Sequence, residues 1–140
     1  MVQIHLHYAG QLRCEATHGP SGTGVVTDAP VDNQGRGESY SPTDLVATAL
    51  GSCMLTIMGI AAEKRGWDIA GAEVTVTKHM VADPARRIGR LEVAMRVPGS
   101  FTEEQRDVLE RAALSCPVGE SISERLEVAL EIVWGADSPA

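Results

Sequence analysis

The sequence has few aromatic side chains and no excess of positive charge. Its 140 residues carry a formal net charge of −7, whereas a protein that binds nucleic acid usually presents a basic surface. The charge therefore argues against a nucleic-acid partner. Aromatic residues make up only 4% of the chain, but other apolar residues bring the hydrophobic fraction to 44%. This is enough for one packed core, and we expect a single domain over residues 1–140.

The chain also lacks the features of an exported or disulfide-stabilised protein. The first segment, MVQIHLHYAG, contains no basic region followed by an apolar run, so no secretory signal is indicated. Three cysteines form an odd number without CxxC spacing, which is unlike a disulfide framework or a zinc site. His5 and His7 share one face of a predicted strand, but no third ligand accompanies them. We expect a cytoplasmic protein with no metal and no other cofactor.

Three strands are predicted in the N-terminal part. Apolar and polar residues alternate from Val2 to Tyr8, and a return strand is expected from Gln11 to Thr17. A short third strand is expected from Val25 to Asp28. The segment from Ala29 to Tyr40 is rich in Pro, Gly, Asn and Asp, and it is predicted to be an irregular connection.

A long helix is predicted after this connection. Ser41 is a suitable N-cap, Pro42 suits the first helical position, and Asp44 lies at the spacing of a capping box. The helix is expected to run to Arg65, where Gly66 ends it.

This predicted helix carries no charged residue from Leu45 to Ala62 and approaches the length of a membrane span. It contains small and polar residues, however, and amphipathic strands flank it. We therefore expect a buried central helix and no membrane partner. Because a helix without charge for about five turns must be covered on all sides, a second copy of the chain would complete the cover. This favours a homodimer.

The second half of the chain is predicted to hold a hairpin, two helices and a closing strand. A helix capped by Thr102, with Gln105 at capping-box spacing, is expected to end at Cys116, which precedes a proline. The other expected elements are strands over Val74–Met80 and Ile88–Val97, a short helix from Pro117 through Leu126, and a strand from Val128 to Trp134. This order indicates an α+β domain with mostly antiparallel sheets around a long central helix.

Two of the three cysteines are candidates for a reactive dithiol, a pair of thiols that can be oxidised and reduced again. Cys53 lies inside the uncharged helix, and Cys116 lies at the predicted N-cap of the short helix. A thiol reacts with peroxides only as the thiolate, and a free pKa near ~8.5 leaves little of it at neutral pH. Cys53 is too far along its helix for the dipole to help. An arginine is needed, and Arg36 in the preceding loop is the first candidate, with Arg13 the second.

Local reasoning leaves open which cysteine attacks first. Backbone amides at a helix start favour a thiolate, so helix electrostatics alone would make Cys116 the more acidic. A cysteine among Ala, Leu and Met is most often an inert core residue, and Cys14, in a predicted strand, is interpreted as structural. No histidine lies in a Ser-His-Asp or Cys-His-Asn pattern, so acyl transfer has little support.

The segments SPTDLVATALGSCM and SCPVGESI resemble the osmotically inducible / organic hydroperoxide resistance (OsmC/Ohr) family. The resemblance covers nearly the whole chain from Gly35 onward. It implies an OsmC-like fold in an intertwined homodimer, with active sites at the subunit interface. It also implies that Cys53 is the peroxidatic thiol and Cys116 the resolving thiol. An external dithiol, in some members a lipoylated protein, would reduce the resulting disulfide.

The sequence departs from this family at one position that bears on the chemistry. In the best-studied members a glutamate follows the helix-starting proline and holds an arginine beside the reactive cysteine. Here that position is Thr43. Glu38 and Asp44 are the candidates to replace the missing carboxylate, and the arginine remains Arg36 or Arg13.

The function that this resemblance implies is a thiol-dependent peroxidase that reduces organic hydroperoxides to alcohols in oxidative-stress defence. Met54, Leu55 and Met58 are expected to supply apolar contacts to the substrate. The alternative is a non-enzymatic redox-responsive stress protein, or a binder of a small hydrophobic ligand, on the same dimeric fold.

Overall fold

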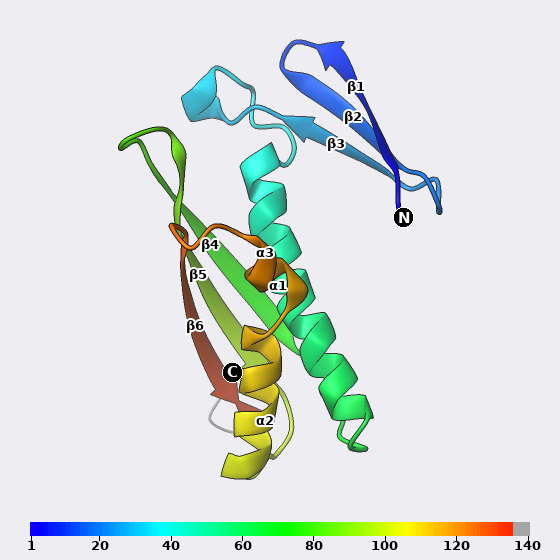
Figure 1. The fold of residues 1–140 in the computed structure, drawn as a ribbon, viewed down its shortest axis with the longest axis vertical. Coiled ribbons are helices and arrows are strands. Elements are labelled where there is room, and N and C mark those ends of the chain that lie inside the picture. The colour runs from blue at the N-terminus through cyan, green and yellow to red at the C-terminus, as the bar shows by residue number, and fades with distance from the viewer. Residues whose placement is uncertain (136–140) are drawn as a thin grey trace. The chain divides into compact units, whose positions relative to one another are not determined.

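The computed structural model describes residues 1–135 and forms two compact units, Met1–Val46 and the chain from Ala47 onward. The elements follow in the order shown in Figure 1: β1 (Ile4–Gly10), β2 (Arg13–His18), β3 (Gly24–Asp28), the 3₁₀ turn η1 (Val31–Asn33), α1 (Pro42–Glu63), β4 (Glu73–Val81), β5 (Arg87–Val97), α2 (Glu103–Leu114), α3 (Pro117–Ser121) and β6 (Glu127–Trp134). The α+β class is confirmed, and the single domain over residues 1–140 stays a prediction.

The first unit is built on an antiparallel sheet in the order β1-β2-β3. A tight turn joins β1 to β2, and Gln11 and Leu12 adopt positive φ there. Three apolar side chains of β1 remain largely exposed, at 58% for Ile4, 61% for Leu6 and 62% for Tyr8. The sheet therefore keeps an apolar surface that no described residue covers.

The second unit holds a sheet in the order β4-β5-β6. The β4–β5 pair is an antiparallel hairpin, whereas β5 and β6 run parallel because α2 and α3 connect them as a crossover. Side chains of β5 alternate between the core and the surface, which fits a sheet covered on one face. Helices α1 and α2 supply that cover (Figure 1), and the core consists of Ala47, Leu50, Met54, Met58, Ala62, Leu91, Val93, Met95, Val97, Leu109, Ala113, Cys116 and Trp134.

The start of α1 is as predicted. The Ser41 N–H donates to Asp44 Oδ2 at 2.9 Å, and the Asp44 N–H donates to Ser41 Oγ at 3.1 Å, so both partners of a capping box are present. The helix ends at Glu63, two residues before the predicted end. Gly66, with φ of +71°, then turns the chain back.

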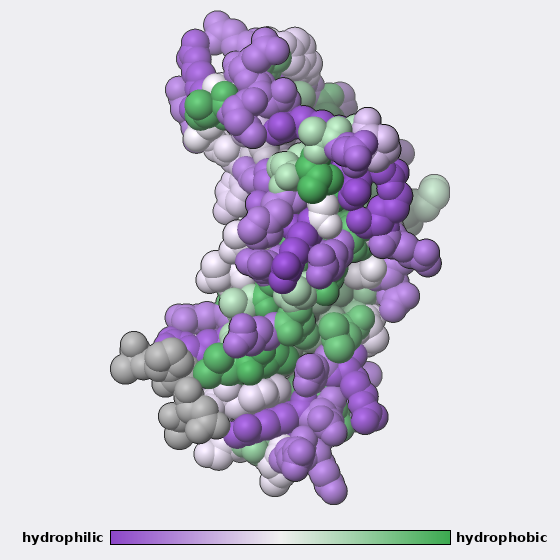
Figure 2. Space-filling model, turned by 90° about the vertical axis from the view of Figure 1, so that its left-hand side faces the viewer, coloured by the Kyte–Doolittle hydropathy of each residue, from purple (hydrophilic) through white to green (hydrophobic). Residues whose placement is uncertain are grey.

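The length and apolar composition of α1 would allow it to cross a membrane. One side of it packs in the core of the second unit through Leu50, Met54 and Met58. Gly51 allows a close approach to the sheet, because a Cβ there would lie 2.8 Å from Val76 Cγ2. Only 33% of an apolar 18-residue stretch of α1 is buried within the described chain, so the other sides of α1 lack cover. Apolar side chains reach the surface on the face shown in Figure 2.

Helix α2 has the predicted capping box between Thr102 and Gln105. Helix α3 is shorter than predicted, since it ends at Ser121 and not at Leu126. Ile122 is extended, and the Ser121 hydroxyl donates back to the Pro117 carbonyl at 2.7 Å. Serine side chains compete with the helical backbone for hydrogen bonds in this way, so the following residues form a turn.

Candidate functional site

Helices α1 and α3 bring the thiols of Cys53 and Cys116 together. The Cys53 thiol lies beside the Cys116 thiol, close enough to raise its pKa, and both residues are free cysteines. Cys116 is fully buried, whereas Cys53 is half-buried. The structure thus contains a dithiol built from two segments that are far apart in the sequence, with one sulfur more accessible than the other.

The local sequence around Cys116 explains its position. The residue before a proline avoids helical geometry, and Cys116 adopts φ −66° and ψ 144° between α2 and α3. The Gly119 N–H donates to the Cys116 Sγ at 3.3 Å. A Cβ on Gly119 would lie 3.3 Å from that sulfur and 3.8 Å from Leu50 Cδ1. Glycine therefore lets the first turn of α3 close over the sulfur.

Burial, rather than the helix start, controls the ionisation of Cys116. Burial raises the pKa of the Cys116 thiol above its ordinary value, and the neighbouring Cys53 thiol raises it further, whereas the N–H groups of Gly119 and Val118 lower it. Helix electrostatics alone predicted the opposite direction for Cys116. The N–H groups at the start of α3 do lower the pKa, but burial of the sulfur in the core outweighs them.

Of the two candidate arginines, only Arg13 has partners among the described residues. Arg13 Nη2 donates to Glu38 Oε2 and lies 3.6 Å from Asp28 Oδ2. Arg36 is exposed and makes no side-chain hydrogen bond or ion pair within residues 1–135. Glu38 and Asp44 were the two candidates to replace the glutamate missing at Thr43. Glu38 contacts Arg13, whereas the carboxylate of Asp44 caps α1.

Asp28 is the residue of this cluster that sequence reasoning missed. It ends β3 and pairs in register with Arg13 at the start of β2. Its side chain is fully buried, Oδ2 accepts the Glu38 N–H at 3.0 Å, and Oδ1 has no partner among the described residues. The available signal was an aspartate at the end of a short apolar strand, which is also an ordinary strand ending.

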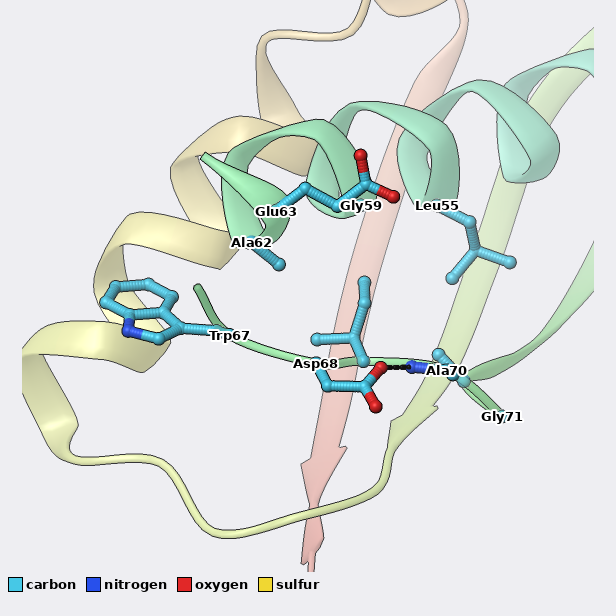
Figure 3. Close-up of a pocket in the computed structure, with 10 residues that line it drawn as sticks. Leu55, Gly59, Ala62, Glu63, Trp67, Asp68, Ala70 and Gly71 are labelled. Atoms are coloured by element: carbon cyan, nitrogen blue, oxygen red, sulfur yellow. Dashed lines mark hydrogen bonds between the residues drawn. The ribbon is translucent and has the colours of Figure 1, made fainter. Parts of the chain in front are cut away.

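Two of the three predicted substrate contacts lie in the core, and their role at a substrate stays a prediction. Met54 and Met58 are buried in the core with exposures of 2% and 0%, because they lie on the side of α1 that packs in the core. Leu55 is half-buried and lines a cavity of about 300 Å³. Figure 3 shows Leu55 and Gly59 of α1 facing the segment that follows Trp67, and neither Cys53 nor Cys116 lines this cavity.

The described part of the chain contains no group of three or more His, Cys, Asp or Glu residues that could hold a metal ion.

The chain is similar to known proteins over most of its length. Residues 35–131 match the family model described as OsmC-like protein. A Psychrobacter arcticus protein, provisionally named an osmotic stress induced and detoxification response protein, is 44% identical with a TM-score of 0.90, over 95% of this chain and 96% of that chain. A search of curated proteins finds no match.

More distant structures share the fold. An organic hydroperoxide resistance protein OsmC from Legionella pneumophila has a TM-score of 0.77 at 15% identity, over 94% of this chain and 96% of that chain. The organic hydroperoxide resistance protein OhrB of Bacillus subtilis has a TM-score of 0.69 at 15% identity, over 95% and 98%.

Proposed function

Because the chain belongs to the OsmC-like protein family, we propose that it is a cysteine-based peroxidase that reduces organic hydroperoxides to alcohols. The observation that carries the proposal is the contact between the Cys53 and Cys116 thiols. Proteins named for organic hydroperoxide resistance share its fold, and they support the substrate class.

The proposed reaction begins at Cys53. The thiolate sulfur attacks the outer oxygen of the hydroperoxide, the O–O bond breaks, and the departing alkoxide takes up a proton and leaves as the alcohol. Cys53 is thereby oxidised to the sulfenic acid. Cys116 then attacks the Cys53 sulfur, which forms a disulfide and releases water. An external dithiol, such as a lipoylated protein, reduces the disulfide by exchange and becomes a disulfide itself.

The unequal burial of the two sulfurs supports this order of attack. Cys53 is half-buried, so its sulfur is the more accessible to a substrate, whereas Cys116 is fully buried. The raised pKa of Cys116 keeps its thiol protonated to a higher pH than that of a free cysteine. Cys116 is thus suited to react second, once the sulfenic acid lies beside it.

The thiolate of Cys53 requires a cation, and the contacts favour Arg13 for this role over Arg36. Both carboxylates engage only Nη2 of Arg13, so its Nε and Nη1 have no partner within the described chain and are available to an anion. Arg36, the first candidate from the sequence, is exposed and makes no side-chain hydrogen bond or ion pair within residues 1–135.

A homodimer is part of the proposal. Two apolar surfaces, the uncovered sides of α1 and the exposed side chains of β1, support it because soluble proteins rarely leave such surfaces open. We place the enzyme in the cytoplasm, where a reduced dithiol pool is present.

The stoichiometry of oxidation tests the proposal. The reduced protein is treated with one equivalent of an alkyl hydroperoxide, and free thiols and intact mass are measured. We expect the thiols of Cys53 and Cys116 to be lost to one disulfide, Cys14 to stay free, and added dithiol to sustain turnover. Cys53→Ser should abolish consumption of the peroxide.

Three results would overturn the proposal or select its alternative. Unchanged thiols, or a Cys53→Ser protein that consumes peroxide at the parental rate, would exclude the peroxidase and leave a ligand-binding protein. A disulfide that forms once but does not turn over with any dithiol would indicate a redox-responsive protein without catalysis.

A further inference from the structure

We infer that a basic surface beside α3 docks an acidic protein that carries the reducing dithiol. Four arginines form this hairpin surface: Arg86 and Arg87 at the β4–β5 hairpin, Arg90 in β5, and Arg125 in the turn between α3 and β6. The inference rests on the proposed function and deepens it, because it gives the external reductant a docking site and a charge.

Positive charge is concentrated in the hairpin of an otherwise acidic chain. Residues 78–90 hold four Lys or Arg residues and one acid, Asp83, whereas the whole chain has a formal net charge of −7. The net charge disfavours a nucleic acid, which binds proteins through larger basic faces. It also repels an acidic protein in general, so a local basic surface would decide where such a protein approaches.

Arg87 carries a charge that no described carboxylate neutralises. It is half-buried, and its Nη1 donates to the carbonyl oxygens of Ile88 at 3.4 Å and Arg125 at 3.0 Å. Its buried Nε has no partner among the described residues, and it forms no ion pair within residues 1–135. The two carbonyls orient the guanidinium but leave its charge uncompensated. A charge partly removed from water is stabilised by an opposite charge, which an acidic partner would supply.

The contact between Arg87 and Arg125 joins the hairpin to the segment that carries Cys116. Cys116 is the N-cap of α3, and the chain passes from α3 into the turn that holds Arg125 (Figure 1). Arg125 is exposed, and its side chain makes no hydrogen bond or ion pair within the described part of the chain. The hairpin surface therefore adjoins the helix that begins at the buried thiol, and it presents an arginine that a partner can reach.

Two nearby acids reduce the charge of this surface without cancelling it. Glu92 Oε1 lies 3.3 Å from Arg90 Nη2, so Arg90 is partly neutralised. Glu124 is exposed beside Arg125 in the sequence, but it makes no side-chain contact with it. Arg87 and Arg125 thus carry the charge that is open to an acidic partner.

Docking beside α3 suits the reduction of the proposed disulfide. A thiolate of the carrier would attack the sulfur of Cys53, which is the more accessible of the two, and Cys116 would leave as a thiol. The second thiol of the carrier would then release Cys53 and close the carrier's own disulfide. Two electrons and two protons pass from the carrier to the protein, and attraction at the hairpin surface holds the carrier during the exchange.

The test compares two dithiols that differ in charge. The Cys53–Cys116 disulfide is formed with diamide, and its reduction by a lipoyl domain of net negative charge or by uncharged dihydrolipoamide is followed by acid-quenched thiol counting. For Arg125→Glu we expect the rate constant with the reduced lipoyl domain to fall about tenfold at low salt, and much less at high salt. The rate constant with dihydrolipoamide should change by less than about twofold, because a neutral dithiol is not steered by charge.

A matched control makes the same change of charge at the other end of α1. Lys64 follows the C-terminal end of this helix, away from the hairpin (Figure 1), and its exposed side chain has no partner among the described residues. Lys64→Glu should leave the rate constants with both dithiols within about twofold of the parent. Any general repulsion by the added negative charge would appear equally in both variants.

Three results would overturn the inference. The first is an equal rate constant for Arg125→Glu and Lys64→Glu with the lipoyl domain, and the second is an equal loss with both dithiols. The third is tighter binding of the parent protein to single-stranded DNA or to anionic vesicles than to polyglutamate, which would assign the hairpin surface to another class of partner. If the protein does not turn over hydroperoxide, the proposed function fails, and reduction of the diamide-formed disulfide still tests the docking.

Discussion

The arginine cluster of the first unit and the thiol pair of the second differ in the forces that hold them. The cluster consists of charges, with Arg13 between a buried and an exposed carboxylate. The thiol pair lies in an apolar core, where burial raises the pKa of Cys116. The difference shows that the surroundings of Cys116 favour its neutral thiol, whereas attack on a peroxide or on a sulfur atom needs a thiolate. In the proposed reaction, a cation outside the apolar core stabilises the thiolate of Cys53.

The largest expected effect comes from removing that charge. Arg13→Ala should lower kcat/KM for an alkyl hydroperoxide about tenfold to a hundredfold, because the thiolate loses its cation. Arg36→Ala, which removes an exposed arginine without a described partner, is the matched control and should stay within about twofold. Steady-state kinetics on both variants checks this. The reverse ranking would assign the cation to Arg36 and separate the Arg13 cluster from catalysis.

The two regions also differ in how far the sequence could predict them. The start of α1 was predictable because Ser41 and Asp44 cap it through bonds between neighbours in the chain. The Asp28–Arg13 pair depends on the register of two strands, which local patterns do not specify.

The thiol pair shows a related limit. The pairing of Cys53 with Cys116 was expected only from the family resemblance, since nothing local joins α1 to α3. The acidity of Cys116 was misjudged because its burial results from packing against distant segments. Capping is a local effect and can be predicted from neighbours, whereas desolvation depends on the whole fold.

A smaller effect is expected from crowding the thiol pair. In Gly119→Ala the new Cβ would lie 3.3 Å from the Cys116 Sγ, and the buried sulfur has little room to move. We expect the free energy of unfolding to fall by about 1 kcal/mol and disulfide formation to slow several-fold. Denaturant titration and acid-quenched thiol counting after peroxide addition measure the two quantities.

Gly59 offers the matched control for this substitution. It also lies in a helix, but a Cβ there meets no atom within 4 Å. Gly59→Ala should therefore stabilise the protein by up to about 1 kcal/mol through its helix propensity, and disulfide formation should be unchanged. Equal behaviour of the two variants would mean that the packing around Gly119 does not control the thiol pair.

The smallest expected effect is a dependence of stability on alkaline pH. Burial raises the pKa of Cys116 in the folded protein, so the folded state holds this proton more tightly than the unfolded state does. The resulting stabilisation is complete below the unfolded pKa and is lost as the pH rises through the folded pKa. Between neutral pH and about pH 10, above the free thiol pKa of ~8.5, the reduced protein should lose more stability than Cys116→Ser does. Denaturant titrations at several pH values compare the two. If the two proteins show parallel curves of stability against pH, the folded state does not favour the protonated thiol of Cys116. The apolar surroundings of the thiol pair would then tolerate an anion, as the surroundings of the arginine cluster do.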